Sequence, residues 1–213
     1  MSVKIDYDAI VVGAGFAGLA LIHHLKKLDI SVKVFDKAKD IGGTWIWNQY
    51  PGAATDSEGY YYCLSFSKEI MQEWKWSQRY PGQEETHRYL HFVADKCDMW
   101  PNIELNTEIV SADFMNDTNL WKVSTADGQT FICRYFISAM GMISQPVIPS
   151  IEGKEKFKGP CFHSSRWPQE GLDYSGKKVG IIGCGASTVQ MLPIMAQTAE
   201  SVTVFQRTPN FVL

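Results

Sequence analysis

The stretch Ala9-Ile10-Val11-Val12-Gly13-Ala14-Gly15-Phe16-Ala17-Gly18 joins a short apolar run to a glycine-rich turn. Apolar residues at helical spacing follow over residues 19–25, and a β-rich run over residues 31–35 ends at Asp36. This order predicts a strand, a tight turn, a helix, a second strand and an acidic residue at its end.

Each glycine of this first turn (residues 13–18) has a physical role in binding a dinucleotide. Gly13 permits the turn, Gly15 lets a pyrophosphate approach the backbone, and Gly18 lets the helix pack on the strand. The helix N-terminus offers N–H groups to the anion, and Asp36, 18 residues after Gly18, would bind a ribose diol. Because the strands, helix and acid are all present, a dinucleotide site is favoured over a glycine turn without a ligand.

A second copy of this pattern lies over residues 178–205. A strand over 178–182, a second turn (residues 183–188), a helix over 189–199 and a strand over 202–205 are expected. We expect Pro193 to bend this helix near its start. Gly183 and Gln206 are 23 residues apart, the same spacing as Gly13 and Asp36.

The second copy differs at two chemically important positions. Gln206 replaces the acid and Arg207 follows it, which favours a nucleotide with a 2′-phosphate because the guanidinium attracts this group. The alternative is that Arg207 is an ordinary solvated charge. Thr188 replaces the third glycine, so its side chain must fit between helix and strand or the helix must shift.

Residues 84–98 read as a helix with one buried face. His87 and His91 lie four apart on it, at a spacing that suits a shared metal. No carboxylate or third histidine supports a metal in the sequence, so we predict no metal site and place both histidines at the helix surface.

Residues 121–125 and 130–133 flank Asp127-Gly128, which is typical of a hairpin. We expect a small antiparallel meander crossing over the parallel sheet, and residues 135–139 returning as a buried strand. The predicted fold class is α/β, with two Rossmann-like dinucleotide-binding units, parallel sheets, the meander, and an incomplete second unit. The predicted limits are a first dinucleotide-binding domain (its N-terminal part) over 1–143, a linker over 144–156 and a second, incomplete one over 157–213.

Composition excludes several classes of protein. Hydrophobic residues make up 45% of the 213 residues, enough for a packed core, and a net charge of −3 gives no basic surface for nucleic acid. No apolar run reaches the length of a membrane span, and the N-terminus lacks a signal-peptide pattern. The five cysteines are scattered, so we read them as reduced, mostly buried thiols in a cytoplasmic protein.

Residues 41–52 combine Gly42-Gly43-Thr44-Trp45 with further aromatic residues, which predicts a loop rather than a regular element. The loop approaches something large and flat, or it packs on its own domain; the composition leaves both readings open. Residues 157–168 fit the pattern FxGxxxHxxxWP, with His163 at its centre. With these motifs, the chain resembles the Baeyer–Villiger monooxygenases of the flavin-containing monooxygenase superfamily over essentially its whole length.

The resemblance implies FAD at the first turn and NADP(H) at the second. It also implies oxygenation of ketones to esters or lactones, using dioxygen and NADPH through a peroxyflavin. Asp56 matches the family's acid near the flavin and nicotinamide; the alternative is a loop-capping aspartate. His163, which alone would be read as a structural histidine, is expected to couple domain movement. Ala54 departs from an arginine common in relatives.

The candidate catalytic residues are Asp56 and His163. The candidate cofactor-binding residues are Gly13, Gly15, Gly18, Asp36, Gly43, Thr44, Trp45, Asp56, Gly183, Gly185, Ser187, Arg207 and Thr208.

Two other functions stay open: a related flavin N- or S-monooxygenase, and a truncated, non-catalytic nucleotide-binding fragment. The resemblance places the family's main active-site arginine and substrate pocket outside this chain. We therefore expect these 213 residues alone to bind flavin weakly and not to turn over substrate.

Overall fold

The computed structural model describes residues 3–168 and 170–209, which form two compact units. The first unit comprises residues 3–46, 62–75 and 86–144, and the second unit comprises residues 47–61, 76–85 and 145–209. The limits predicted for the two nucleotide domains remain a prediction. Two segments of the N-terminal half, residues 47–61 and 76–85, group with the second unit.

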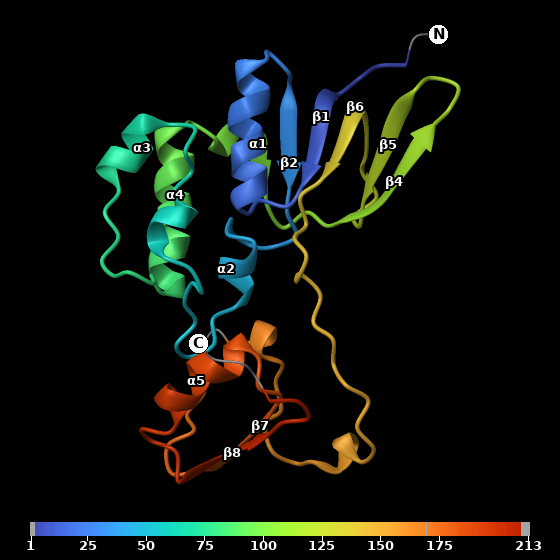
Figure 1. Ribbon diagram of the computed structural model, residues 1–213. Coiled ribbons are helices and arrows are strands. Elements are labelled where there is room, and N and C mark those ends of the chain that lie inside the picture. Colours follow the sequence, from blue (N-terminus) through green and yellow to red (C-terminus); the bar gives the residue numbers. More distant parts are fainter. Residues whose placement is uncertain (1–2, 169, 210–213) are drawn as a thin grey trace. The chain divides into compact units, whose positions relative to one another are not determined.

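The first unit is built on one six-stranded sheet with the order β3-β2-β1-β6-β5-β4 (Figure 1). Strands β3, β2, β1 and β6 are parallel, whereas β5 and β4 are antiparallel to their neighbours. The predicted α/β class with parallel strands and an antiparallel meander is confirmed. The strands are β1 (Tyr7–Val12), β2 (Val32–Phe35), β3 (Ile103–Glu104), β4 (Ile109–Met115), β5 (Leu120–Thr125) and β6 (Thr130–Ser138).

Strand β6 corrects the predicted meander. Residues 130–133 and 135–139 were expected as separate strands, but Thr130–Ser138 is continuous and pairs with β5 on one side and β1 on the other. The meander therefore extends the parallel sheet instead of crossing over it. The returning strand was also expected to be buried, yet Tyr135 is 55% exposed. Local alternation cannot show that one strand serves both neighbours, because pairing is set by residues far apart in sequence.

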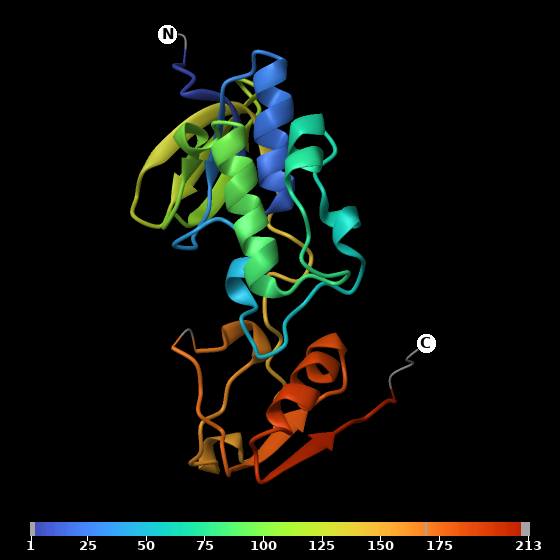
Figure 2. The ribbon, with the colours of Figure 1, turned by 90° about the vertical axis from the view of Figure 1, so that its left-hand side faces the viewer.

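Helix α1 (Phe16–Lys27) packs on β1 and β2, and α4 (Gln83–Lys96) lies beside it (Figure 2). The Phe16 ring stacks on the fully buried Tyr89 of α4 at a centroid distance of 6.1 Å. Helix α3 (Lys68–Glu73) is capped at its N-terminus by the Ser67 hydroxyl, which accepts a hydrogen bond from the Ile70 N–H. Helix α4 confirms the helix predicted over residues 84–98, although it begins one residue earlier and ends two residues earlier.

The prediction of a loop throughout residues 41–52 was wrong at one point. A single-turn helix, α2 (Thr44–Trp47), forms after the glycine pair, where the Trp45 and Ile46 N–H groups donate to the carbonyls of Gly42 and Gly43. Four short 3₁₀ helices complete the described elements, at Gly59–Tyr62, Trp100–Asn102, Lys154–Lys156 and Ser164–Arg166.

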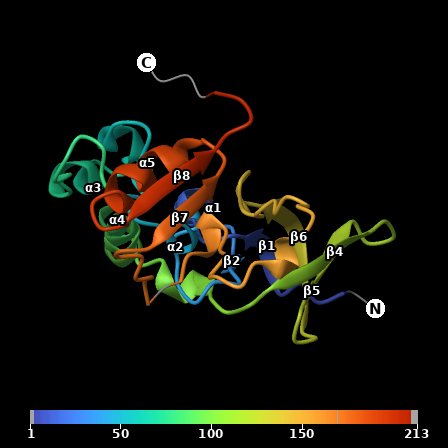
Figure 3. The same ribbon diagram turned by 90° about the horizontal axis from the view of Figure 1, so that it is seen from below.

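The second unit contains the parallel pair β7 (Lys178–Ile182) and β8 (Ser201–Phe205), with α5 (Ala186–Met195) covering one face (Figure 3). Helix α5 begins three residues earlier than predicted, directly at the turn. Pro193 lies near its end rather than its start, and because proline has no N–H, it cannot donate to the carbonyl four residues before it. Buried Tyr50, Ile181 and Met191 belong to the core of this unit.

The prediction that the cysteines are mostly buried was wrong. Cys133 on β6 is buried, Cys161 is exposed, and the other three are half-buried. Burial raises the pKa of the Cys133 thiol to about 11, so this thiol is held neutral within the sheet. Within the part of the chain that the structure describes, no helix has the length and apolar character to cross a membrane.

Candidate dinucleotide sites

The first turn needs glycine at Gly13 because the ends of β1 and β6 meet there. Gly13 has a φ of +114°, and a Cβ added to it would lie 2.4 Å from the Ala139 carbonyl oxygen. Its N–H donates to the Phe35 carbonyl at 2.8 Å, which joins the turn to the end of β2. No L side chain fits this position without displacing backbone.

Gly18 lets α1 begin directly against the turn. A Cβ at this position would lie 2.0 Å from the Gly13 carbonyl oxygen and 3.7 Å from Val34 on β2. The predicted role of Gly18 in close packing of helix and strand therefore has a geometric basis. The closest atom is main-chain, so it cannot move aside as a flexible side chain could.

Gly15 faces the glycine pair of the following loop. A Cβ on Gly15 would lie 3.3 Å from the Gly43 Cα, and Gly43 itself has a φ of +55°. The Gly42 N–H donates to the Ala14 carbonyl at 2.9 Å. The glycine pair thus lets two backbone segments lie against each other beside the N-terminus of α1.

Asp36 is 8% exposed, and its carboxylate stabilises the first turn through two hydrogen bonds from main-chain N–H groups. One oxygen accepts a hydrogen bond from the Ala14 N–H at 2.7 Å and the other accepts from the Ala38 N–H at 2.8 Å. Each carboxylate oxygen retains a second lone pair. Asp36 is therefore fixed in place and keeps acceptor capacity for the hydroxyls of a ribose.

Both α1 and α5 begin without a side-chain cap. Their N-cap residues are Gly15 and Gly185, neither helix has an acidic residue in its first turn, and no side chain accepts a hydrogen bond at either N-cap. The N–H groups of a first helical turn lack intrahelical partners and attract anions. The two turns therefore fit the pyrophosphate of a dinucleotide.

The second turn is wider than the first. A Cβ built on Gly183 or Gly185 meets no described atom within 4 Å. Thr188, which occupies the third glycine position, is buried, and its hydroxyl donates to the Gly183 carbonyl at 3.1 Å. The wider spacing of the turn and this hydrogen bond accommodate the Thr188 side chain beside the helix, as expected from the sequence.

Arg207 and Thr208 follow β8, and both are exposed. The Thr208 carbonyl accepts a hydrogen bond from the Cys184 thiol at 2.9 Å, which holds this segment against the second turn. Ser187 is half-buried in the first turn of α5, next to the phenol of Tyr50. Burial is the largest of the effects that raise the pKa of Tyr50, so its hydroxyl stays a donor at neutral pH.

Asp56 is held by Gln190, a residue that the sequence gave no reason to single out. The Gln190 amide nitrogen donates to the Asp56 carboxylate and to the Ala54 carbonyl, both at 3.0 Å. The Gln190 amide oxygen accepts from the Tyr50 hydroxyl at 2.8 Å. One α5 side chain thus fixes three residues of the segment that follows α2, and with them the candidate catalytic carboxylate.

Gly52 brings this segment close to α5. It has a φ of +79°, and a Cβ added there would lie 2.5 Å from the Gln190 carbonyl oxygen. Glycine at this position therefore permits the close approach that places Gln190 within reach of Tyr50, Ala54 and Asp56.

His163 has a local structural role in this structure. Its Nδ1 accepts a hydrogen bond from the Ser165 N–H at 3.2 Å and contacts the Ser165 hydroxyl at 2.9 Å, capping a 3₁₀ turn. The next arginine, Arg166, stacks over the Trp47 ring at 4.9 Å. The role of His163 in domain movement stays a prediction.

Trp45 and Thr44 belong to α2. Trp45 is 8% exposed, and its ring meets the edge of Tyr62 at a centroid distance of 5.7 Å. Within the first unit, this aromatic residue therefore packs on its own domain, which was one of the two readings left open by the sequence.

The prediction that no carboxylate accompanies His87 and His91 was wrong. Asp40, in the loop after β2, lies 2.9 Å from the His91 Nε2 and 3.4 Å from the His87 Nε2. Sequence spacing could not show this, because 47 residues separate Asp40 from His87. The side chains of both histidines are also partly buried, with exposures of 21% for His87 and 35% for His91.

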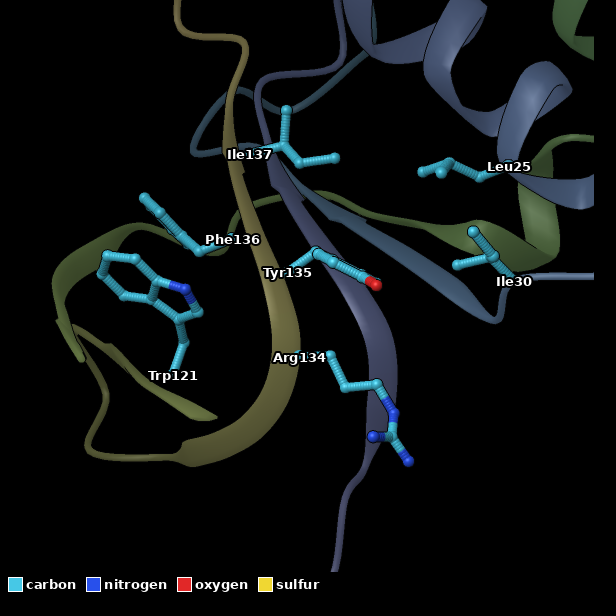
Figure 4. Close-up of a pocket in the computed structure, with 7 residues that line it drawn as sticks. All are labelled: Leu25, Ile30, Trp121, Arg134, Tyr135, Phe136 and Ile137. Atoms are coloured by element: carbon cyan, nitrogen blue, oxygen red, sulfur yellow. The ribbon is translucent and has the colours of Figure 1, made fainter. Parts of the chain in front are cut away.

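A shallow apolar depression lies at the other end of α1, away from the first turn (Figure 4). Leu25 and Ile30 line one side, and residues 134–137 of β6 with Trp121 line the rest. It brings together none of the candidate site residues, so it is separate from the dinucleotide sites.

Two glycine turns, each opening an uncapped helix between parallel strands, define a protein of the dinucleotide-binding class. Comparison with known proteins gives the particular family. The chain belongs to the pyridine nucleotide-disulphide oxidoreductase family, whose model matches residues 10–211.

The resemblance to Baeyer–Villiger monooxygenases is confirmed among curated relatives. The chain is 45% identical over 206 residues to an acetone monooxygenase (methyl acetate-forming) of Gordonia sp. (strain TY-5), covering 97% of this chain and 39% of the relative. It is 43% identical to the phenazine N-monooxygenase PhzNO1 of Lysobacter antibioticus, covering 98% of this chain and 38% of the relative.

Among solved structures, the OTEMO complex with FAD and NADP superimposes with a TM-score of 0.92 at 40% identity. The match covers 98% of this chain and 40% of that one. The chain thus spans about 39% of the length of the curated relatives it matches.

Proposed function

We propose that the protein to which these residues belong is a Baeyer–Villiger-type monooxygenase that uses FAD and NADPH to convert ketones to esters or lactones. The observation that carries the proposal is the pair of glycine turns, each followed by a helix without a side-chain cap. The residues at the end of the strand that follows each helix differ between the two copies. A buried carboxylate, Asp36, ends β2, whereas Gln206 and exposed Arg207 follow β8. The relatives that match nearly the whole of this chain include the acetone monooxygenase and the complex with FAD and NADP.

The first turn fits FAD. Gly13 and Gly18 keep the turn tight, Gly15 leaves backbone accessible beside the N-terminus of α1, and the fixed Asp36 carboxylate has lone pairs for ribose hydroxyls. Gly43, with Thr44 and Trp45 beyond it, would complete this side of the site. The bound flavin supplies hydride acceptance and the activation of dioxygen, and the protein supplies its binding and orientation.

The second turn fits NADP(H). Gly183 and Gly185 leave open space at the N-terminus of α5, and no carboxylate follows β8 to repel a 2′-phosphate. The guanidinium of Arg207 would form a charge-assisted hydrogen bond with this phosphate, and Ser187 and Thr208 add hydroxyl donors nearby.

Asp56 would act as a fixed acceptor next to the nicotinamide end of the second site. Gln190 restrains its carboxylate from α5, so the acceptor is positioned before a ligand binds. A prearranged acceptor loses less freedom on binding than a mobile one.

A second function, oxygenation of an aromatic nitrogen, is favoured by one observation. The phenazine N-monooxygenase is nearly as similar to this chain as the acetone monooxygenase, at 43% and 45% identity. The two reactions differ in the substrate, so the products distinguish them.

The function is tested in a chimaera in which these residues replace the matching segment of the Gordonia acetone monooxygenase. The chimaera is supplied with FAD, NADPH, a panel of cyclic and linear ketones, and phenazine. Esters or lactones formed in proportion to the NADPH consumed support the proposal, and N-oxides as the dominant products support the second function. A purified chain that takes up no flavin, with no yellow flavin spectrum, would favour the non-catalytic alternative.

Flavin content should fall stepwise when Gly15 is replaced by alanine and then valine. The added Cβ meets the Gly43 Cα at 3.3 Å, and the valine methyl groups extend further into the pyrophosphate path. We expect at least a tenfold lower flavin-to-protein ratio for Gly15→Val, measured from absorbance after desalting. Equal flavin content in parent and folded Gly15→Val protein would rule out this site.

Affinity for NADPH should depend on Arg207. Removal of one charge-assisted contact to a phosphate costs on the order of 1.5–3 kcal/mol, so Arg207→Ala should weaken NADPH binding at least tenfold and leave NADH binding almost unchanged. The measurement is a titration with both nucleotides, with Arg88→Ala, an exposed arginine on α4, as the matched control. An equal loss for NADPH and NADH would contradict the assignment.

A further inference from the structure

Three metal-binding side chains meet between α4 and the loop that follows β2. His87 and His91 lie one helical turn apart on α4, and the loop supplies Asp40. The ligand atoms of all three residues lie within 4.8 Å of one another. Packing is tight here, because a Cβ on Gly42 would lie 3.0 Å from the His87 ring.

The spacing of these atoms suits a small divalent cation. In tetrahedral zinc sites the metal–ligand bonds of about 2.0–2.2 Å place ligand atoms roughly 3.3 Å from one another. The Asp40 oxygen is 2.9 Å from the His91 Nε2 and 3.4 Å from the His87 Nε2, so two of the three separations need almost no change. Small rotations of the imidazoles would bring the third pair closer.

We propose that Asp40, His87 and His91 bind one divalent transition-metal ion, with zinc as the best match. Two imidazoles and one carboxylate are a zinc-type ligand set, whereas calcium and magnesium prefer oxygen ligands throughout. Three protein ligands leave a fourth position for water. The His87 Nε2, which is 2.9 Å from the Ile41 carbonyl in this structure, would exchange this contact for the metal.

The metal would join the loop to α4 and thereby stabilise the first turn. Asp40 precedes the glycine pair, and the Gly42 N–H donates to the Ala14 carbonyl within that turn. A cross-link at Asp40 therefore restrains the backbone beside the N-terminus of α1. This site does not rest on the proposed function, because it needs neither flavin nor substrate.

The test uses the untagged 213-residue chain, stripped of metal with a chelator and titrated with zinc by calorimetry. We expect one equivalent of zinc to bind, and a Tm that rises with free zinc and returns to its starting value when chelator is added. Cobalt should give the visible absorption bands of a four-coordinate site. Absence of a stoichiometric zinc complex would overturn the proposal and leave the cluster as a histidine–aspartate ion pair.

Variants locate the site. Asp40→Asn and His91→Gln should each weaken zinc binding at least tenfold, whereas His24→Gln, which changes an exposed histidine on α1, should bind like the parent. Melting without zinc shows whether each variant is folded; if His91→Gln does not fold, the nearly isosteric Asp40→Asn decides. Parent-like zinc binding by folded Asp40→Asn would place the metal elsewhere and overturn the assignment.

Discussion

Replacing Gly18 by alanine is expected to destabilise the first unit by about 3 kcal/mol, the upper limit of the usual range for overpacking. The added Cβ would lie 2.0 Å from the Gly13 carbonyl oxygen, so α1 or the turn must move. Gly13 is itself restrained by the end of β6, where an added Cβ would meet Ala139 at 2.4 Å. The measurement is urea unfolding followed by circular dichroism, together with flavin content, which should be lost with the turn.

The second turn supplies the control for this prediction. Thr188 occupies the position equivalent to Gly18, and its hydroxyl donates to Gly183 at 3.1 Å. Thr188→Gly removes one hydrogen bond and adds backbone freedom, so it should cost only about 1–2 kcal/mol. If Gly18→Ala unfolds at the same urea concentration as the parent, the tight packing of the first turn is not required.

The elements that could be predicted from the sequence are those whose signals are local. The strands on either side of each glycine turn and the helix over 83–96 follow from apolar periodicity and glycine placement. Strand β6 could not be predicted as one element, because it pairs with β1 and β5, two strands that lie far apart in the sequence. The single-turn helix α2 was missed because its four residues are too few to show a helical period.

The same limit applies to the candidate sites. The glycines and Asp36 were found because their spacing is fixed by a local turn. Gln190 was missed although it contacts Asp56, because 134 residues separate the two. Asp40 was missed as a partner of His91, 51 residues away, for the same reason. A local motif identifies the residues that form a turn, whereas the residues that restrain it come from distant segments.

Replacing Gln190 by glutamate is expected to destabilise the second unit by about 3 kcal/mol. The carboxylate would lose the two donor contacts, to Ala54 and to Asp56, and would place a like charge next to Asp56. Four hydrogen bonds, each contributing about 0.5–1.5 kcal/mol, depend on this one side chain. Gln190→Ala should cost less, about 2 kcal/mol, because it removes the bonds without adding a charge.

A double-mutant cycle separates the charge from the lost bonds. Asp56→Asn in the Gln190→Glu background removes the like-charge contact, so it should restore part of the lost stability, on the order of 0.5–1 kcal/mol since Asp56 is exposed. Unfolding in urea measures each protein, and Gln197→Ala, which changes an exposed glutamine beyond the end of α5, is the matched control. If the double variant is no more stable than Gln190→Glu, the two side chains are not in contact, and Gln190 cannot be what positions the candidate catalytic carboxylate.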